Sequence, residues 1–303
     1  MAEALTGPTC RLCDAEAPLV ESHLLPAFVV RRFMRASPTG ASRSAGNPNV
    51  RKQDYLKKPL LCADCDNVRF GSREKIFAEL VDARFENRTL PAKGFPFSEE
   101  LRYCAASLAW RIIVWGLGER EGEGFHDNDR AKLETSEAAL RKYLLDETPF
   151  PEESGLWVHL IMAPYFTEGT PAGVNELLHA TLGATIEANG KNLWVIAFMA
   201  GYLVVMVVSL DGDNFIAWTL NTALMPGWKI IPGRLTHDKK FWESLAHFSE
   251  KMKEARKPLS PRQSAKVAQR VEAVPLEKLR TNPHVFALFM DYLNRTQEEG
   301  DGK

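Results

Sequence analysis

The spacing of apolar residues predicts helices in the first half of the chain. Residues 98–117 carry apolar side chains at helical spacing, and Ser98 precedes them in a position to cap the helix. Residues 72–87 have a second helical pattern, for which Ser72 is the expected N-cap. The apolar face of this second helix consists of Ile76, Phe77, Leu80, Val81 and Phe85. A third helix is predicted at 128–146.

From about residue 155 to 235 the apolar runs become short and rich in β-branched and aromatic residues, which is typical of strands. Helical spacing returns towards the end of the chain. The fold class is therefore predicted to be α+β, with an antiparallel sheet and flanking helices. The expected strands are 156–163, 193–199, 202–209, 214–220 and 228–231, and the expected later helices are 238–256, 261–272 and 275–295.

Residues 193–210 form an uncharged stretch of 18 residues, which is close to the shortest membrane-spanning helix. The stretch is rich in Val, Ile, Phe and Trp, however, and Gly201 interrupts it. Two buried strands joined by a tight turn at Ala200–Gly201 explain both features. We therefore expect no contact with a membrane.

Two segments are rich in turn-forming residues. Residues 36–49, rich in Ser, Gly, Pro and Asn, are expected to form an exposed flexible loop. Residues 89–97 contain two prolines and a glycine and are interpreted as a linker. The expected domains are consequently 1–97 and 98–303, the second being an α+β domain whose role the sequence does not reveal.

The net charge of −1 gives no reason to expect a polyanionic partner for the chain as a whole, but the charge is distributed unevenly. Residues 1–97 contain 15 Lys/Arg and 11 Asp/Glu, and residues 24–60 contain eight basic residues and one acid. Such a basic segment is either a solvated loop or a set of phosphate contacts. The residues chosen as candidate nucleic-acid contacts are Arg31, Arg32, Arg51 and Lys52.

Four of the five cysteines form two Cys-x-x-Cys pairs with the overall spacing C-x2-C-x48-C-x2-C. A two-residue gap lets both thiolates of a pair face one ion, and two such pairs complete the tetrahedron that Zn²⁺ prefers. The alternatives are a chance arrangement or a redox motif. The absence of an evident signal peptide favours metal in a reducing, cytoplasmic compartment. The predicted structural zinc ligands are Cys10, Cys13, Cys62 and Cys65.

The motifs around these cysteines, "CRLC…ESHLLP…LLCADCDNVRFGSRE", resemble the zinc-containing branch of the HNH (ββα-metal) endonucleases. They resemble more closely a set of bacterial proteins that share the Ser-His-x-x-Pro motif and the paired Cys-x-x-Cys motifs. The resemblance covers roughly residues 9–88, under a third of the chain. It implies an N-terminal zinc-bound module of two strands and a helix, and a nuclease activity.

In that family a central histidine is the general base that activates water, and nearby side chains hold a divalent ion. His23 matches the base in the motif of this sequence. We expect Glu21, Glu74 and Asp54 to help hold Mg²⁺ or Mn²⁺, since Glu21 shares the strand face of His23 and Glu74 lies near a predicted helix start, although Glu74 does not fall cleanly on the family's ligand position. Ser22 stands where the family usually has Asp, Glu or His, and the nearest acid is one residue earlier, at Glu21.

Two functions remain open at this point. The first is a metal-dependent HNH-like nuclease that hydrolyses phosphodiester bonds of nucleic acid, with DNA the more expected substrate than RNA. The second is a catalytically inactive zinc module that binds nucleic acid or a protein partner. His23, Glu21 and the basic segment favour the nuclease. Ser22 favours the inactive module, and so does Lys57, which stands where the family usually has Asn. The sequence gives no indication of the oligomeric state.

Overall fold

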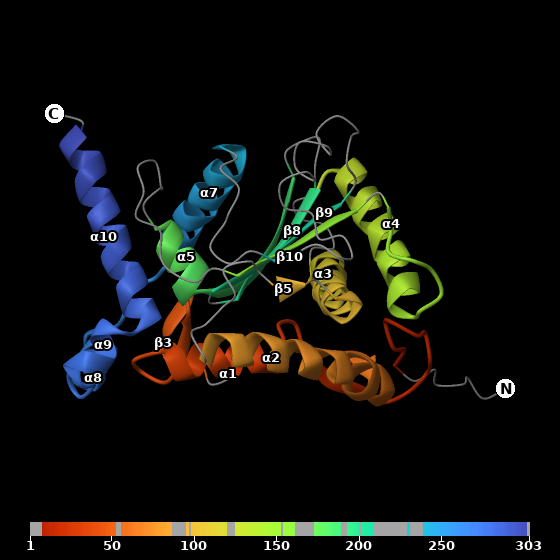
Figure 1. Cartoon of the computed structure of the whole chain (residues 1–303), viewed down its shortest axis with the longest axis horizontal. Coiled ribbons are helices and arrows are strands. Elements are labelled where there is room, and N and C mark those ends of the chain that lie inside the picture. Colours follow the sequence, from red (N-terminus) through yellow and green to blue (C-terminus); the bar gives the residue numbers. More distant parts are fainter. Residues whose placement is uncertain are drawn as a thin grey trace.

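A computed structural model of the whole chain shows a protein of mixed helices and antiparallel sheets, which agrees with the predicted α+β class (Figure 1). The residues that the structure describes are 8–52, 56–86, 95–96, 98–119, 125–152, 154–160, 173–188, 193–199, 201–208, 229–230 and 239–301.

The N-terminal part is built on two strands and a helix. Strand β1 (Leu19–His23) pairs antiparallel with β4 (Lys57–Cys62), and His23 lies opposite Lys57 in the register. A π-helical segment, η1 (Asp64–Phe70), follows β4 and continues into helix α2 (Gly71–Glu86). Leu19 lies opposite Cys62, so the start of β1, the end of β4 and the start of the helix lie next to the cysteines. His23 lies at the other end of this strand pair.

The segment between β1 and β4 is more ordered than expected. Helix α1 (Ala27–Ala36) follows His23, and strands β2 (Ser42–Ser44) and β3 (Asn47–Lys52) then form a hairpin. The expectation of a flexible loop at 36–49 is therefore wrong for the hairpin. The physical reason is tertiary: the backbone N–H of Lys257 donates to the carbonyl of Ala45, so a distant segment fixes the hairpin.

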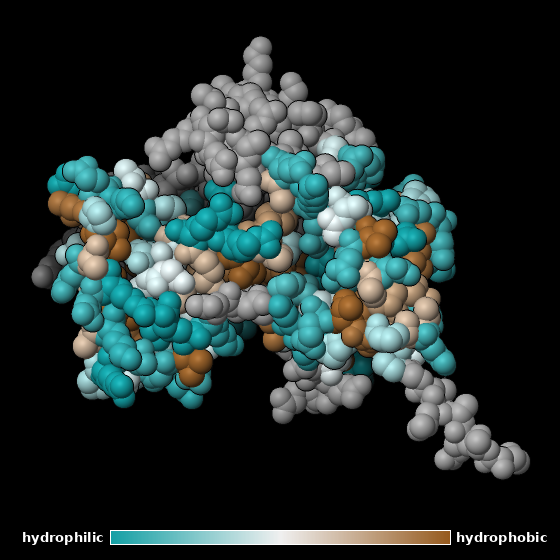
Figure 2. All heavy atoms as spheres, turned by 90° about the horizontal axis from the view of Figure 1, so that it is seen from below, coloured by the Kyte–Doolittle hydropathy of each residue, from teal (hydrophilic) through white to brown (hydrophobic). Residues whose placement is uncertain are grey.

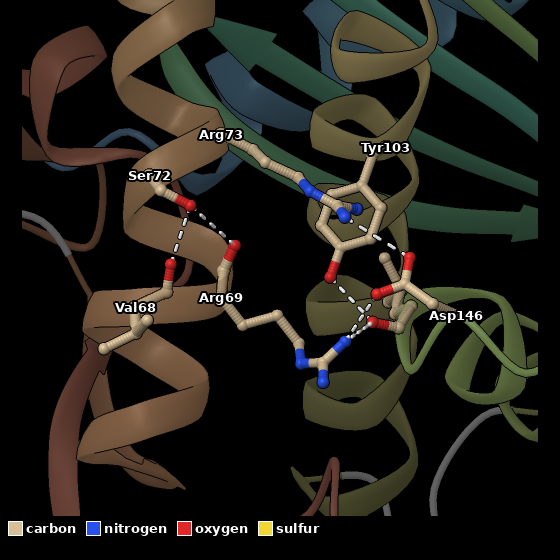
Figure 3. A network of polar contacts seen from close by, with 7 residues as sticks. Val68, Arg69, Ser72, Arg73, Tyr103 and Asp146 are labelled. Atoms are coloured by element: carbon tan, nitrogen blue, oxygen red, sulfur yellow. Dashed lines mark hydrogen bonds and ion pairs between the residues drawn. The ribbon is translucent and has the colours of Figure 1, made fainter.

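Ser72 is not the N-cap that the sequence suggested. The helix has already begun at η1, so Ser72 lies inside a continuous helical segment. Its hydroxyl donates to the carbonyl of Val68 at 2.7 Å, the usual bond of a serine within a helix (Figure 3). The helix begins earlier because Cys65, the last cysteine of the second pair, already lies in its first turn.

Helix α3 (Glu99–Glu119) is the central element of the fold. The N–H of Leu101 donates to Ser98 Oγ at 3.3 Å, which confirms the predicted cap. Almost the whole length of α3 is buried, and Trp110 is completely enclosed. It contacts α2, α4 (Asp127–Leu144) and the main sheet, and lies between α2 and that sheet (Figure 1).

The main sheet has four antiparallel strands in the order β6–β9–β8–β7. The uncharged stretch 193–210 provides two of them, and Gly201 between them has φ +99°, which only glycine adopts without strain. The prediction of two strands and a tight turn is confirmed, whereas β7 was not expected. The strand bounds are β6 Gly155–Leu160, β7 Leu182–Ala188, β8 Leu193–Met199 and β9 Tyr202–Val208.

Among the helices in the described part of the chain, none combines the length and the apolar character that crossing a membrane requires. The strand expected at 214–220 falls outside the described residues. The strand expected at 228–231 is present as β10 (Lys229–Ile230), which pairs antiparallel with β5 (Phe95–Pro96).

The C-terminal helices cover the side of the molecule opposite α4 (Figure 1). The single helix expected at 275–295 is wrong, because the chain breaks into α9 and α10 just before Pro283. Asn282 Oδ1 accepts hydrogen bonds from the N–H groups of His284 and Val285, so it caps a new helix there. The bounds are α5 Val174–Ala180, α7 Lys239–Ala255, α8 Pro261–Glu272, α9 Leu276–Arg280 and α10 Pro283–Asp301.

One continuous hydrophobic core joins the residues on both sides of position 97, from Cys10 to Met206. Phe70 packs edge-on against Tyr103 and Trp110, with ring centroids 6.1 Å apart in both pairs. Arg69 and Arg73 add ion pairs to Asp146 over this contact (Figure 3). The segment that contains the four cysteines and helices α3 and α4 therefore pack as one body.

Candidate metal centre and the cavity beside His23

The four cysteines of the two Cys-x-x-Cys pairs come together. Their sulfur atoms all lie within 4.8 Å of one another, and the Cys13 and Cys62 sulfurs are 3.9 Å apart. Three of the four side chains are buried, and Cys13 is partly exposed. Within the described residues this is the only group of three or more His, Cys, Asp or Glu side chains arranged to hold a metal ion.

The first pair is shaped by a tight turn. The N–H of Asp14 donates to the carbonyl of Cys10 at 2.9 Å, and Asp14 has φ +57°, a conformation that aspartate tolerates better than most residues. The N–H of Arg11 donates to the carbonyl of Leu60 at 3.1 Å and ties this turn to β4. The local sequence thus folds both thiols of the pair towards the end of β4.

The second pair joins a strand to a helix. Cys62 is the last residue of β4, and Cys65 lies in η1. The wider π-helical turn is uncommon and is frequent at functional sites. Because β4 and η1 are consecutive, the two sulfurs of this pair can face the same point while the chain changes from strand to helix.

The electrostatics of the cluster are those of thiols crowded together. Burial raises the pKa of Cys10, but N–H groups of Cys13, Cys62 and Leu12 donate to its sulfur, and the net effect lowers the pKa to about 7. Burial raises the pKa of Cys65 well above its ordinary value, and the thiols of Cys62 and Cys13 raise it further. A cation among the four sulfurs would offset the repulsion between thiolates, so the donor set fits a metal ion.

A cavity of about 400 Å³ lies at the end of β1, between β4 and helices α3 and α4. Ser22 and His23 line it, and so do Lys57 and Lys58 from β4. Two acids of α4, Glu134 and Glu137, also line the cavity. Glu134 pairs with Arg130 at 3.0 Å, and Glu137 accepts a hydrogen bond from the Trp110 indole at 2.9 Å. The charged lining residues are Arg11, Lys57, Lys58, Arg111, Arg130, Glu134 and Glu137.

Arg111 of α3 connects the candidate site residues to the core, and the sequence reasoning missed it. Its guanidinium donates to the carbonyl of His23 at 3.3 Å and pairs with Glu74 at 2.5 Å. Its side chain is only 3% exposed and stacks over the ring of Phe70, 4.7 Å from the centroid. An arginine in the apolar pattern "LAWRIIVW" is the signal that could have indicated a buried charge partner.

The acids assigned to a catalytic ion are not brought together in the described residues. Glu74 lies on α2 with its carboxylate paired to Arg111, and Glu21 is exposed on β1. Asp54 falls outside the described residues. His23, Glu21 and Glu74 form no group that could share an ion, so the described side chains do not fit the Mg²⁺ or Mn²⁺ site that the resemblance implies.

The candidate nucleic-acid contacts divide between two elements. Arg31 is exposed and Arg32 half-buried on α1, whereas Arg51 and Lys52 are both exposed on β3. Arg51 donates to the carbonyl of Thr39 at 3.4 Å. The basic segment of the sequence is therefore presented as one helix and one hairpin.

Comparison of the chain with family models, with curated proteins and with solved structures gave no match.

Proposed function

We propose that Cys10, Cys13, Cys62 and Cys65 bind one structural zinc ion. Four thiols within reach of a single ion are the ligand set of closed, tetrahedral zinc sites, which leave no position for substrate. The ion would hold together the turn after Thr9, the end of β4 and η1. It would thereby support the strand that ends in His23.

We further propose that the protein acts on nucleic acid at the cavity beside His23 and hydrolyses phosphodiester bonds there. The observation that carries this proposal is that His23 shares the cavity with Arg11, Lys57 and Lys58. A neutral imidazole can take a proton from water near pH 7. Cationic side chains can bind the phosphate and stabilise the negative charge that develops on it.

The described acids do not fit a divalent-ion site, so in the proposed reaction the cations of the cavity carry the charge stabilisation. Water attacks phosphorus, its proton passes to the imidazole of His23, and the bond to the leaving oxygen breaks. The leaving oxygen then takes up a proton from solvent. DNA and RNA are both candidate substrates.

A second function, binding of nucleic acid without cleavage, is favoured by one observation. Glu74 is paired with a buried arginine, and its carboxylate oxygen at 2.5 Å from Arg111 is engaged in that pair. If no ion binds and the cations alone do not lower the barrier enough, the cavity would bind phosphate and release it unchanged.

The decisive assay compares cleavage of labelled duplex DNA, single-stranded DNA and RNA by the zinc-loaded wild type and by His23→Ala. Loss of a general base removes about 10²–10⁴-fold in rate, so His23→Ala should reduce cleavage by that factor. His247→Ala, which removes an exposed histidine of α7, is the matched control and should cleave like the wild type.

Each reaction is repeated with added Mg²⁺ or Mn²⁺, and zinc content is measured in every preparation. Cleavage that is equal in wild type and His23→Ala would contradict the assignment of His23. Binding without cleavage under all these conditions would establish the inactive-module function instead.

A further inference from the structure

Helix α8 carries a row of positive charges that the proposed function does not use. Arg262, Lys266 and Arg270 are spaced four residues apart, so they lie along one side of the helix, and all three are exposed. The only acid of α8 is Glu272, which follows Arg270 by two residues and so faces another direction. Like charges at this spacing repel one another and destabilise a helix.

The β2–β3 hairpin fixes the position of α8. Arg43 of β2 donates through Nη2 to Gln263 Oε1 at 3.2 Å, and Asn49 Oδ1 accepts from the N–H of Ser260 at 2.8 Å. Ser260 is also the N-cap of α8. Two segments more than 200 residues apart in the sequence therefore form one surface.

This surface concentrates positive charge. The pKa of Arg43 is lowered by burial and then by the positive charges of Arg51 and Arg270, which places guanidinium groups of the hairpin and of α8 close together. No ion pair between described residues includes any of the exposed cations here. These are Arg51, Lys52, Arg262, Lys266 and Arg270.

The hairpin surface also leads to the cavity beside His23. A second cavity, of about 830 Å³, is lined by Arg43 and Lys52 of the hairpin and by Lys257 from the segment before α8. Leu56 lines both this cavity and the cavity at His23. A long polyanion bound at one cavity would therefore reach cationic side chains at the other cavity.

We propose that the β2–β3 hairpin and α8 together bind the sugar-phosphate backbone of the nucleic acid whose phosphodiester bond is cleaved at His23. This inference rests on the proposed function. A helix rises 1.5 Å per residue, so the cations of α8 are spaced about 6 Å apart along its axis and can each contact a different phosphate. The face of the molecule that contains this end of the fold is mainly hydrophilic (Figure 2).

A membrane surface fits α8 less well. Helices that lie in a membrane interface need a large apolar face opposite the basic one. The side chains of α8 are small or polar apart from two valines, and none of the large exposed apolar side chains of the described chain belongs to it. Exposed Arg and Lys side chains without apolar anchors instead suit contacts to phosphates.

The test measures binding of a fluorescent 20-base-pair DNA duplex over a series of salt concentrations. The variant is Arg262→Gln, Lys266→Gln and Arg270→Gln combined, which keeps good helix formers on an exposed face. Each phosphate contact contributes about 0.9 to the slope of log affinity against log salt, so the slope should fall in magnitude by up to about 2.7. Low-salt affinity should fall about tenfold or more.

The matched control is Lys75→Gln, Lys132→Gln and Lys142→Gln, which removes the same charge from α2 and α4 and should leave the slope unchanged. The double variant Lys57→Gln, Lys58→Gln tests the proposed site separately and should weaken binding. If it does so while the α8 variant keeps the wild-type slope, the inference about α8 is overturned and the proposed site stands. Wild-type binding to anionic phospholipid vesicles but to no nucleic acid would overturn both proposals.

Discussion

At the scale of single residues, Arg111 and Glu74 form the contact that matters most to the candidate site. Arg111 is nearly fully buried, and its guanidinium reaches both the carboxylate of Glu74 and the carbonyl of His23. A buried guanidinium is costly unless it is paired and hydrogen-bonded. The pair therefore positions the end of β1 against α2 and α3.

Replacing Glu74 by Gln should consequently destabilise the protein. The change leaves a buried positive charge without its counter-ion, which costs about 3 kcal/mol in comparable buried pairs. Urea unfolding followed by circular dichroism measures the effect. Glu79→Gln is the control, because Glu79 lies on the same helix in an exposed pair with Lys75. An equal loss in both variants would contradict the role of the Arg111 pair.

A second residue, His284, links stability to pH. Burial lowers its pKa from 6.5 to about 4, and its ring lies 4.9 Å from that of Phe33. The unfolded chain therefore binds more protons than the folded one between about pH 6.5 and pH 4. The free energy of unfolding that depends on His284 is therefore highest above pH 6.5 and falls as the pH decreases towards 4.

The free energy of unfolding should thus decrease by up to about 3 kcal/mol over that interval, at about 1.4 kcal/mol per unit of pKa difference. His284→Phe removes the titrating group while keeping an aromatic ring, and it should flatten this part of the profile. His247→Phe alters an exposed histidine and should not. Parallel profiles for His284→Phe and the wild type would refute the assignment.

At the scale of elements, the candidate metal centre joins a turn, a strand and a helix start. Small segments that are held by a structural zinc ion gain much of their folding free energy from the metal. The centre should bind one zinc ion per chain, which elemental analysis of purified protein can measure. Cys62→Ser should lose that ion, because it removes one of four ligands.

Amide hydrogen exchange then shows which elements depend on the metal. We expect β1, β4 and α2 to exchange faster in Cys62→Ser, with a smaller change in α3, which packs against α2. Cys104→Ala is the control, since Cys104 is buried in α3 away from the cluster and should leave the zinc content unchanged. Full zinc content in Cys62→Ser would contradict a four-cysteine site.

At the scale of the whole molecule, one hydrophobic core contains residues from both sides of the segment 89–97 that was interpreted as a linker. The segment that contains the four cysteines could be recognised from local spacing, but the residues that pack against it could not. Phe70 packs against Tyr103 and Trp110, and Arg111 reaches Glu74 across 37 residues of sequence. Contacts of this kind depend on which helix faces which, and a pattern within one segment carries no such information.

The sequence by itself determined the features that are local. The Cys-x-x-Cys spacing, the cap at Ser98 and the two strands around Gly201 follow from chemistry within a few residues, and the structure confirms the convergence of the cysteines and both secondary-structure features. Only the tertiary structure decided that the loop at 36–49 contains a hairpin, because Lys257 and Ser260 bind it from far along the chain. The same holds for the pairing of Glu74 with Arg111 and of the hairpin with α8: each joins side chains whose distance is set by packing.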